Sequence, residues 1–299
     1  MNFKQQAEVF MTEIASRKSD PVRSNTLHVY RSLLDARILP AIGGVEMADV
    51  NNKTARMLVG RLTEAQLSPA TINLAVALMK QVVKSAVDDE GDPLYPRTWN
   101  SRFIDAPRVV PAKQKTPIAP VEALSRAVGT TSGEVKALVA LLAGTGLRIG
   151  EALALMVGPD DGKNSFWIPE SGTLIIRTTM VDGVIQLDTK TKAGTRIVDL
   201  DPNLAWLLRA TFRDRESGVL FTASESTFRR CMKEHGISGF HSMRRFRITY
   251  LQNSSVPNTL VKFWAGHAAG DMTERYTKFG AQIEERKNWS EKAGLGFSL

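Results

Sequence analysis

The chain has 299 residues, 43% of them hydrophobic, and a formal net charge of +8. This length allows about two domains, and the apolar content is sufficient for packed cores, which excludes a disordered chain. No apolar run approaches the roughly 18 residues of a membrane span, and Cys231 is the only cysteine. We therefore expect a cytoplasmic protein with no membrane contact and no disulfide.

The positive charge is unevenly distributed along the chain. The first hundred residues contribute +1 and the remainder +7. A positive field of this kind favours polyanions, with nucleic acid as the expected partner. An anionic membrane surface fits less well, because we find no basic amphipathic helix.

Residues 1–105 carry the pattern of a helical domain. Apolar residues recur at spacings of three to four in four segments, separated by short polar or glycine breaks. The segments are AEVFMTEIAS, TLHVYRSLLDARI, KTARMLVGRLTEA and SPATINLAVALMKQVVKSAVDD. Ser68 before Pro69 is typical of an N-cap followed by a first-turn proline. The sequence predicts a bundle of four helices.

Residues 106–120 have the composition of a linker. Four prolines alternate with Arg108, Lys113 and Lys115, and no acidic residue follows Asp105 before Pro120. Such a segment is extended rather than packed. Its three basic side chains are candidate DNA-phosphate contacts, although a solvated tether has the same composition.

Residues 121–299 predict a second domain. Two helical segments come first, and residues 173–200 then contain three β-branched runs separated by VDG and KAG turns. Residues 203–297 return to helical periodicity. We expect a mainly α (α+β) protein in which this domain has a small three-stranded antiparallel sheet.

Three short motifs in the second domain carry candidate chemistry. In TGLRIGE, Arg148 starts a helix and Glu151 lies three positions later, so the two share a face. In HSMR, His241 and Arg244 are also one turn apart. Each motif alone fits an ordinary surface ion pair or a core histidine. His235 and His241 lack further ligands at usable spacing, so we expect no metal site.

The third motif is GHAAGDMTERYT, in which Tyr276 follows His267 by nine residues. Taken in order, these motifs and a lysine between them resemble the tyrosine recombinase (phage integrase) family. Residues 1–105 are similar to its core-binding, SAM-like helical domain, and 121–299 to its catalytic domain with a C-terminal tail. Residues 106–120 take the place of the basic linker between them.

The resemblance implies a role for each matching residue. Arg148 and Arg244 would clamp the scissile phosphate, because a guanidinium offers two parallel N–H donors. His241 and His267 would flank that phosphate and donate hydrogen bonds or move protons. Tyr276 would attack phosphorus to form a 3′-phosphotyrosyl bond. Glu151 would orient these groups without contacting the DNA.

The general acid for the leaving 5′-oxygen stays open between two lysines. In DTKTKAGTRIVDL, Lys190 and Lys192 lie two apart on one face of the predicted hairpin, and Lys192 beside the AG turn is slightly preferred. Arg245 and Arg247 follow the HSMR arginine and are expected to face DNA phosphates or water.

Three positions depart from the family pattern. Arg245 stands where a second histidine is frequent, Asp199 replaces a frequent proline, and Trp264 precedes Gly-His in FWAGH. None of these positions is a catalytic group. An amphipathic segment around Ile283 to Trp289 either docks on a neighbouring protomer or folds back on its own domain.

The expected function is that of a site-specific DNA recombinase, or integrase, of a mobile element. It would cleave and rejoin double-stranded DNA as a homotetramer on DNA, be a monomer or weak oligomer when free, and need no cofactor. The alternatives are a catalytically silent DNA-binding protein of the same fold and a type IB topoisomerase.

Overall fold

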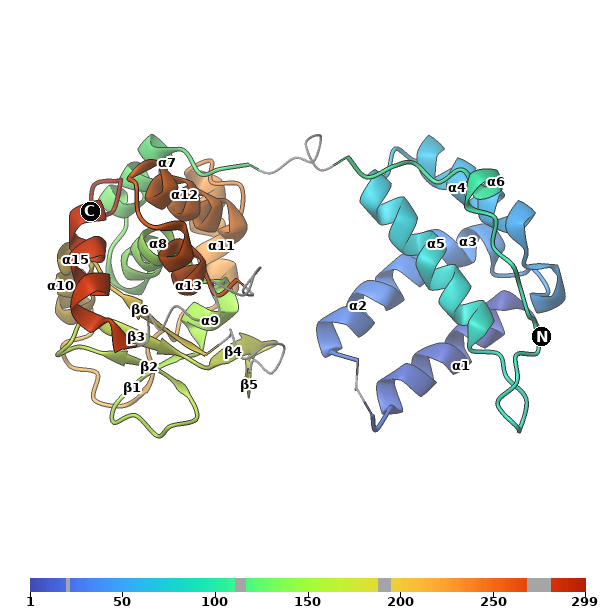
Figure 1. Cartoon of the computed structure of the whole chain (residues 1–299), viewed down its shortest axis with the longest axis horizontal. Helices are drawn as coiled ribbons and strands as arrows, with labels where there is room; N and C mark the ends of the chain where they lie inside the picture. Colours follow the sequence, from blue (N-terminus) through green and yellow to red (C-terminus); the bar gives the residue numbers. More distant parts are fainter. Residues whose placement is uncertain (20–21, 111–116, 188–194, 268–280) are drawn as a thin grey trace. The chain divides into compact units, whose positions relative to one another are not determined.

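The computed structural model describes residues 1–19, 22–110, 117–187, 195–267 and 281–299. The chain divides into two compact units, Met1–Gln114 and Lys115–Leu299. Both are drawn in Figure 1.

The first unit is helical. The four segments with helical spacing are all helices. The second segment continues through a π-helical turn at Leu34–Ile38, and a 3-10 turn follows later in the chain at Met47–Asp49. Its α-helices are α1 (Phe3–Ser16), α2 (Ser24–Leu33), α3 (Leu39–Ile42), α4 (Asn52–Glu64), α5 (Pro69–Lys84) and α6 (Ser101–Ile104). Ser68 caps α5 by accepting from the backbone of Thr71, with Pro69 in the first turn, as predicted.

The second unit is built around one buried helix. Every residue from Ala137 to Thr145 of α8 is buried, so this helix is apolar on all sides. It packs against α7, α10, α11 and α12 (Figure 1). The helices described here are α7 (Val121–Thr130), α8 (Gly133–Thr145), α9 (Ile149–Leu153), α10 (Pro202–Thr211), α11 (Glu225–Glu234), α12 (Phe240–Asn253), α13 (Asn258–Ala265) and α15 (Ile283–Ala293).

The sheet differs from the predicted three-stranded antiparallel one. A five-stranded mixed sheet has the order β6-β3-β2-β1-β7, and β4 and β5 form a separate two-stranded sheet. In the larger sheet β1 pairs with β2 in parallel. The strands are β1 (Leu155–Val157), β2 (Ser165–Ile168), β3 (Thr173–Ile176), β4 (Thr178–Val181), β5 (Val184–Leu187), β6 (Arg196–Asp199) and β7 (Gly218–Val219).

The prediction failed at Arg177, where the first β-branched run divides into β3 and β4. The hydroxyl of buried Ser165 accepts the backbone N–H groups of Arg177 and Thr178, both at 2.8 Å. These side-chain bonds interrupt the ladder, so β3 pairs with β2 and β6 while β4 leaves to pair with β5. Strands β1, β2 and β7 are only two to four residues long, which is too short for a reliable period.

The C-terminal segment folds back on its own unit, which is one of the two alternatives left open by the sequence. Arg286, Ser290 and Ala293 of α15 are buried, and so is Leu295 beyond it. Arg247 of α12 donates to the carbonyl of Gly294 at 2.6 Å. This segment therefore forms part of the core of the second unit.

In the part of the chain that the structure describes, no helix is long and apolar enough to cross a membrane.

Candidate active site

The loop between α8 and α9 places the first arginine. Gly146 ends α8 with φ +72°, a conformation that favours glycine, and Arg148 is the N-cap residue of α9. Gly150 in the first turn of α9 lets β4 come close, because a Cβ there would lie 2.7 Å from the carbonyl oxygen of Met180. The TGLRIG sequence thus places Arg148 between the end of the central helix α8 and helix α9, which packs against β4.

Glu151 connects Arg148 to the interior. Its carboxylate accepts from Nη1 of Arg148 at 2.7 Å and from the backbone N–H of Arg148 at 2.9 Å. Glu151 is 1% exposed, whereas the Arg148 side chain is 43% exposed. Burial acts to raise the pKa of Glu151, but attraction to Arg196 and then Arg148 outweighs it and holds that pKa below its usual value. The pair predicted from the i, i+3 spacing is therefore present, and Arg148 is its exposed member.

Arg244 is the second arginine of the cluster and is held by backbone groups. It lies on α12, is 6% exposed, and donates to the carbonyl oxygens of Gly146 and Ala265. Burial, followed by the nearby charge of Arg148, lowers the pKa of Arg244 to about 10. The guanidinium stays protonated at neutral pH, at an electrostatic cost that a bound anion would relieve.

Two histidines lie beside the arginines. His241 is at the start of α12, one turn before Arg244. His267 follows α13, whose end has the hydrogen bonds of a Schellman motif: Gly266 N–H donates to Phe263 O and His267 N–H to Lys262 O. Both histidines are exposed.

The pKa values of both histidines are depressed by the same neighbours. For His241 the causes are burial, then Arg244, Arg245 and Arg148. For His267 they are burial, then Arg244, Arg148 and Arg196. The structure therefore brings Arg148, His241, Arg244 and His267 together. One buried carboxylate, that of Glu151, lies among three arginines, so the cluster has surplus positive charge for an anion.

The predicted site residues are not all accounted for in this cluster. Lys113, Lys115, Lys190, Lys192 and Tyr276 lie outside the described residues.

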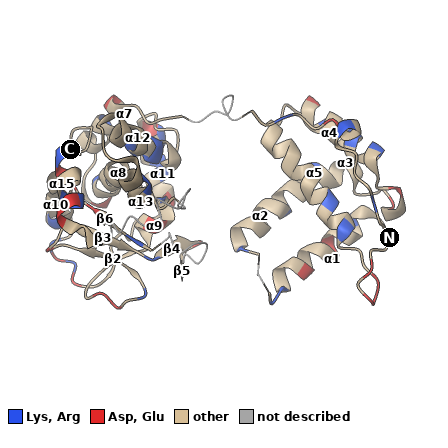
Figure 2. Cartoon of the chain, in the orientation of Figure 1, with Lys and Arg blue, Asp and Glu red and all other residues tan. Residues whose placement is uncertain are grey.

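The three remaining predicted arginines are Arg108, Arg245 and Arg247, of which Arg245 lies near enough to His241 to lower its pKa. Arg108 is exposed, at the end of the first unit. Arg245 is partly exposed and donates to the carbonyl of Pro117 at 3.1 Å. Figure 2 marks the basic residues of α11 and α12 in blue.

The prediction for Arg247 is corrected. It is 4% exposed and donates to the carbonyls of Gly294 and Leu295, so its guanidinium faces neither DNA nor water. The structural reason is that the C-terminal segment covers this face of α12, where it provides carbonyl acceptors for a buried arginine.

Sequence reasoning missed Arg196 on β6. Its guanidinium binds the Glu151 carboxylate through both terminal nitrogens, at 3.2 and 2.8 Å, and its Nε donates to Trp264 O at 2.8 Å. The sequence does contain a signal for this residue. Arg196 and Val198 lie two apart on a strand and therefore share its buried face, and a buried charge needs a partner.

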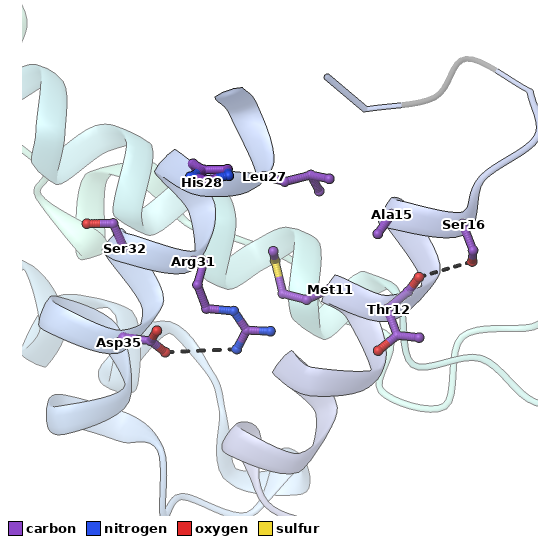
Figure 3. Close-up of a pocket in the computed structure, with 9 residues that line it drawn as sticks. All are labelled: Met11, Thr12, Ala15, Ser16, Leu27, His28, Arg31, Ser32 and Asp35. Carbon is purple, nitrogen blue, oxygen red and sulfur yellow. Dashed lines mark hydrogen bonds and ion pairs between the residues drawn. The ribbon is translucent and has the colours of Figure 1, made fainter. Parts of the chain in front are cut away.

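An open groove of about 790 Å³ lies in the first unit, between α1 and α2 (Figure 3). None of the predicted site residues lines it; the lining residues are Met11, Thr12, Ala15, Ser16, Leu27, His28, Arg31, Ser32 and Asp35. Among the described residues no cluster of three His, Cys, Asp or Glu side chains could hold a metal ion.

The depressed histidine pKa values predict a response to anions. In the free protein we expect the imidazoles of His241 and His267 to titrate below 6.5. Added inorganic phosphate should raise both midpoints, because an anion stabilises the imidazolium form. Imidazole NMR signals, assigned with His241→Gln and His267→Gln, would measure this, with the His28 signal as a control for general salt effects. A midpoint at or above 6.5 without phosphate would contradict the description of the cluster.

The model of the phage integrase family matches residues 118–282, which is more than half of the chain. The chain therefore belongs to this family, the tyrosine recombinases. A search of curated proteins found no significant match.

Solved structures of integrases have a similar fold. The Tn1549 transposon integrase in complex with a circular intermediate DNA has a TM-score of 0.67 and 19% identity, over 96% of this chain and 99% of that chain. A lambda integrase dimer bound to a COC′ core site gives 0.60 and 15%, over 94% and 79%. A lambda integrase tetramer bound to a Holliday junction gives 0.59 and 15%, over 91% and 79%. At these identities the likeness concerns the fold, mainly helical with a mixed sheet.

Proposed function

We propose that the protein is a site-specific DNA recombinase that cleaves and rejoins strands through a 3′-phosphotyrosyl intermediate. The observation that carries the proposal is the convergence of Arg148, His241, Arg244 and His267, which come from three separate segments. A phosphate diester has the charge and the acceptor oxygens that this donor set fits.

The two arginines are suited to hold the non-bridging oxygens of the scissile phosphate. Arg148 has an exposed guanidinium fixed from behind by Glu151, and Arg244 is anchored by two backbone carbonyls. Neither needs to reorganise when negative charge develops on the non-bridging oxygens, which is the condition for effective transition-state stabilisation.

The reaction conserves the energy of the phosphodiester bond. The phenol oxygen of Tyr276 attacks phosphorus, the bond from phosphorus to the 5′-oxygen breaks, and a 3′-phosphotyrosyl ester and a 5′-hydroxyl result. Lys192 or Lys190 protonates the leaving oxygen. Neutral His241 or His267, each with a lowered pKa, can accept the phenol proton. Religation reverses these steps.

We further propose that the reaction needs no metal or other cofactor, since the arginines and a lysine provide the positive charge and the histidines provide proton transfer. The helical unit and the basic segment with Arg108, Lys113 and Lys115 would complete a clamp around double-stranded DNA. A homotetramer on two DNA partners is the proposed active form. The similar lambda integrase tetramer bound to a Holliday junction supports it.

Trapping of the covalent intermediate tests the proposal. Duplexes bound by the protein would be selected from a random library, and a nicked suicide substrate built on the selected site. In the presence of EDTA we expect a denaturant-resistant protein–DNA adduct whose modified peptide contains Tyr276. Absence of an adduct with every selected site would favour a silent DNA-binding protein. Relaxation of a supercoiled plasmid that lacks the site would favour a type IB topoisomerase.

A further inference from the structure

We propose that Arg196 is a positioning residue, which holds the Arg148 side and the His267 side of the active site at a fixed separation. The inference rests on the proposed recombinase function for its kinetic consequences. The contacts that carry it are all between described residues.

The first contact is with the Arg148 side. The Glu151 carboxylate is shared: Oε1 accepts from Nη1 of Arg148 and of Arg196, and Oε2 accepts from the Arg148 backbone and from Nη2 of Arg196. The Arg196 and Glu151 side chains are each 1% exposed. Among the described residues, Glu151 is the only hydrogen-bond partner of the Arg148 guanidinium, so the position of this guanidinium depends on where Arg196 holds the carboxylate.

The second contact is with the His267 side. Nε of Arg196 donates to the carbonyl of Trp264, and Arg244 donates to the next carbonyl, that of Ala265. These are terminal carbonyls of α13, which have no partner within the helix. Two arginines therefore fix the helix end from which His267 emerges, and the favourable interaction of a cation with a helix C-terminus supports both.

Gly266 shows how closely Arg196 fits. A Cβ at Gly266 would lie 2.8 Å from Cζ of Arg196, a distance that Cβ atoms do not adopt. The glycine of the Gly-His pair thus has two uses: it adopts φ +66° and it leaves room for the guanidinium.

The chain also provides a matched control for Gly266. Gly236 ends α11 with φ +72° and the same pair of hydrogen bonds, from Gly236 N–H to Lys233 O and from Ile237 N–H to Met232 O. A Cβ at Gly236 meets no atom within 4 Å. The Gly236→Ala variant therefore has the backbone strain of Gly266→Ala without the contact with Arg196.

The test compares Arg196→Lys, Gly266→Ala and Gly236→Ala in single-turnover cleavage of the suicide substrate at saturating DNA. We expect the rate to fall about 10- to 100-fold in the first two, as for a reacting group displaced by about 1 Å. The Gly236→Ala rate should stay near the wild type, and the Kd for DNA should be similar in all three. Cleavage at the wild-type rate by both Arg196→Lys and Gly266→Ala would overturn the proposal.

A second measurement does not depend on catalysis. In Arg196→Met the titration midpoint of His267 should rise more than that of His241, because Arg196 depresses the pKa of His267 and is not among the causes for His241. Equal shifts of the two histidines would contradict the positioning role even if the wild type formed no adduct. If Arg196→Met does not fold, the same comparison is made in Gly266→Ala, where a displaced guanidinium should again affect His267 more. A wild type without any adduct would refute the recombinase function alone.

Discussion

Replacing Tyr276 with phenylalanine is expected to abolish the covalent adduct and to leave the affinity for DNA essentially unchanged. The change removes only the attacking oxygen. The arginines that we propose to bind the phosphate are held by other groups: Arg148 by Glu151, and Arg244 by the carbonyls of Gly146 and Ala265. The measurement is denaturing electrophoresis of the suicide-substrate reaction, together with a binding titration at fixed salt, since phosphate contacts make affinity salt-dependent.

Tyr250→Phe is the matched control, because it removes the same atom from another tyrosine of the second unit. The Tyr250 hydroxyl donates to the carbonyl of Ala293 at 2.7 Å. Its loss should cost about 1 kcal/mol of stability and leave adduct formation intact. An adduct in Tyr276→Phe, or none in Tyr250→Phe when that variant is folded and binds DNA, would refute the assignment of the nucleophile.

A phenol needs such a site to react at neutral pH, because its ordinary pKa is about 10. In the proposed mechanism the cluster would act on the transition state rather than by making the tyrosine strongly acidic. Surplus positive charge around a bound phosphate would stabilise the charge that develops as the phenol attacks. The neutral histidines, with their depressed pKa values, are in the protonation state that accepts a proton.

Features set by local spacing could be predicted from the sequence. The Arg148–Glu151 pair depends on an i, i+3 interval at a helix start, and the common face of His241 and Arg244 depends on one helical turn. The cap at Ser68 depends on its own following residues. In each case the interacting groups lie within one turn, so the period of the helix decides the outcome.

Features set by long-range pairing could not be predicted. The sheet order depends on Ser165, whose hydroxyl interrupts the strand twelve residues later. Nothing near Arg247 in the sequence indicates that the carbonyls of Gly294 and Leu295 accept from its guanidinium. The strand pattern indicates that Arg196 is buried and needs a partner, but it does not indicate which partner, since Glu151 lies 45 residues away.

Asp199 and Trp264, two departures from the family pattern, contact each other in the structure. Asp199 and Trp264 are 65 residues apart in the sequence. In the structure the indole N–H of Trp264 donates to the Asp199 carboxylate at 3.0 Å, and Arg286 of α15 donates to the same oxygen at 2.8 Å. The two unusual residues thus form the buried contact with which α15 interacts through Arg286.

We therefore expect Arg286→Met to destabilise the second unit by about 3–5 kcal/mol, because it leaves a buried carboxylate without its ion partner. Arg286 and Asp199 are each 1% exposed at the side chain. Helix α15 makes two further contacts with Asp199. Nη2 of Arg286 donates to Asp199 Oδ1 at 3.4 Å, and the Ser290 hydroxyl donates to the Asp199 carbonyl at 3.2 Å. Urea unfolding followed by tryptophan fluorescence measures the change, because four of the five tryptophans belong to this unit.

Two further variants distinguish the loss of the ion pair from a general destabilisation of α15. Lys287→Met shortens the neighbouring, partly exposed side chain and should change stability by no more than about 0.5 kcal/mol. Adding Asp199→Asn to Arg286→Met removes the unpaired charge and should restore part of the loss, which gives a coupling energy between the two positions. If Arg286→Met is as stable as Lys287→Met, the ion pair does not hold the C-terminal helix. A strictly additive double variant would mean that the carboxylate is not what makes the loss of Arg286 costly.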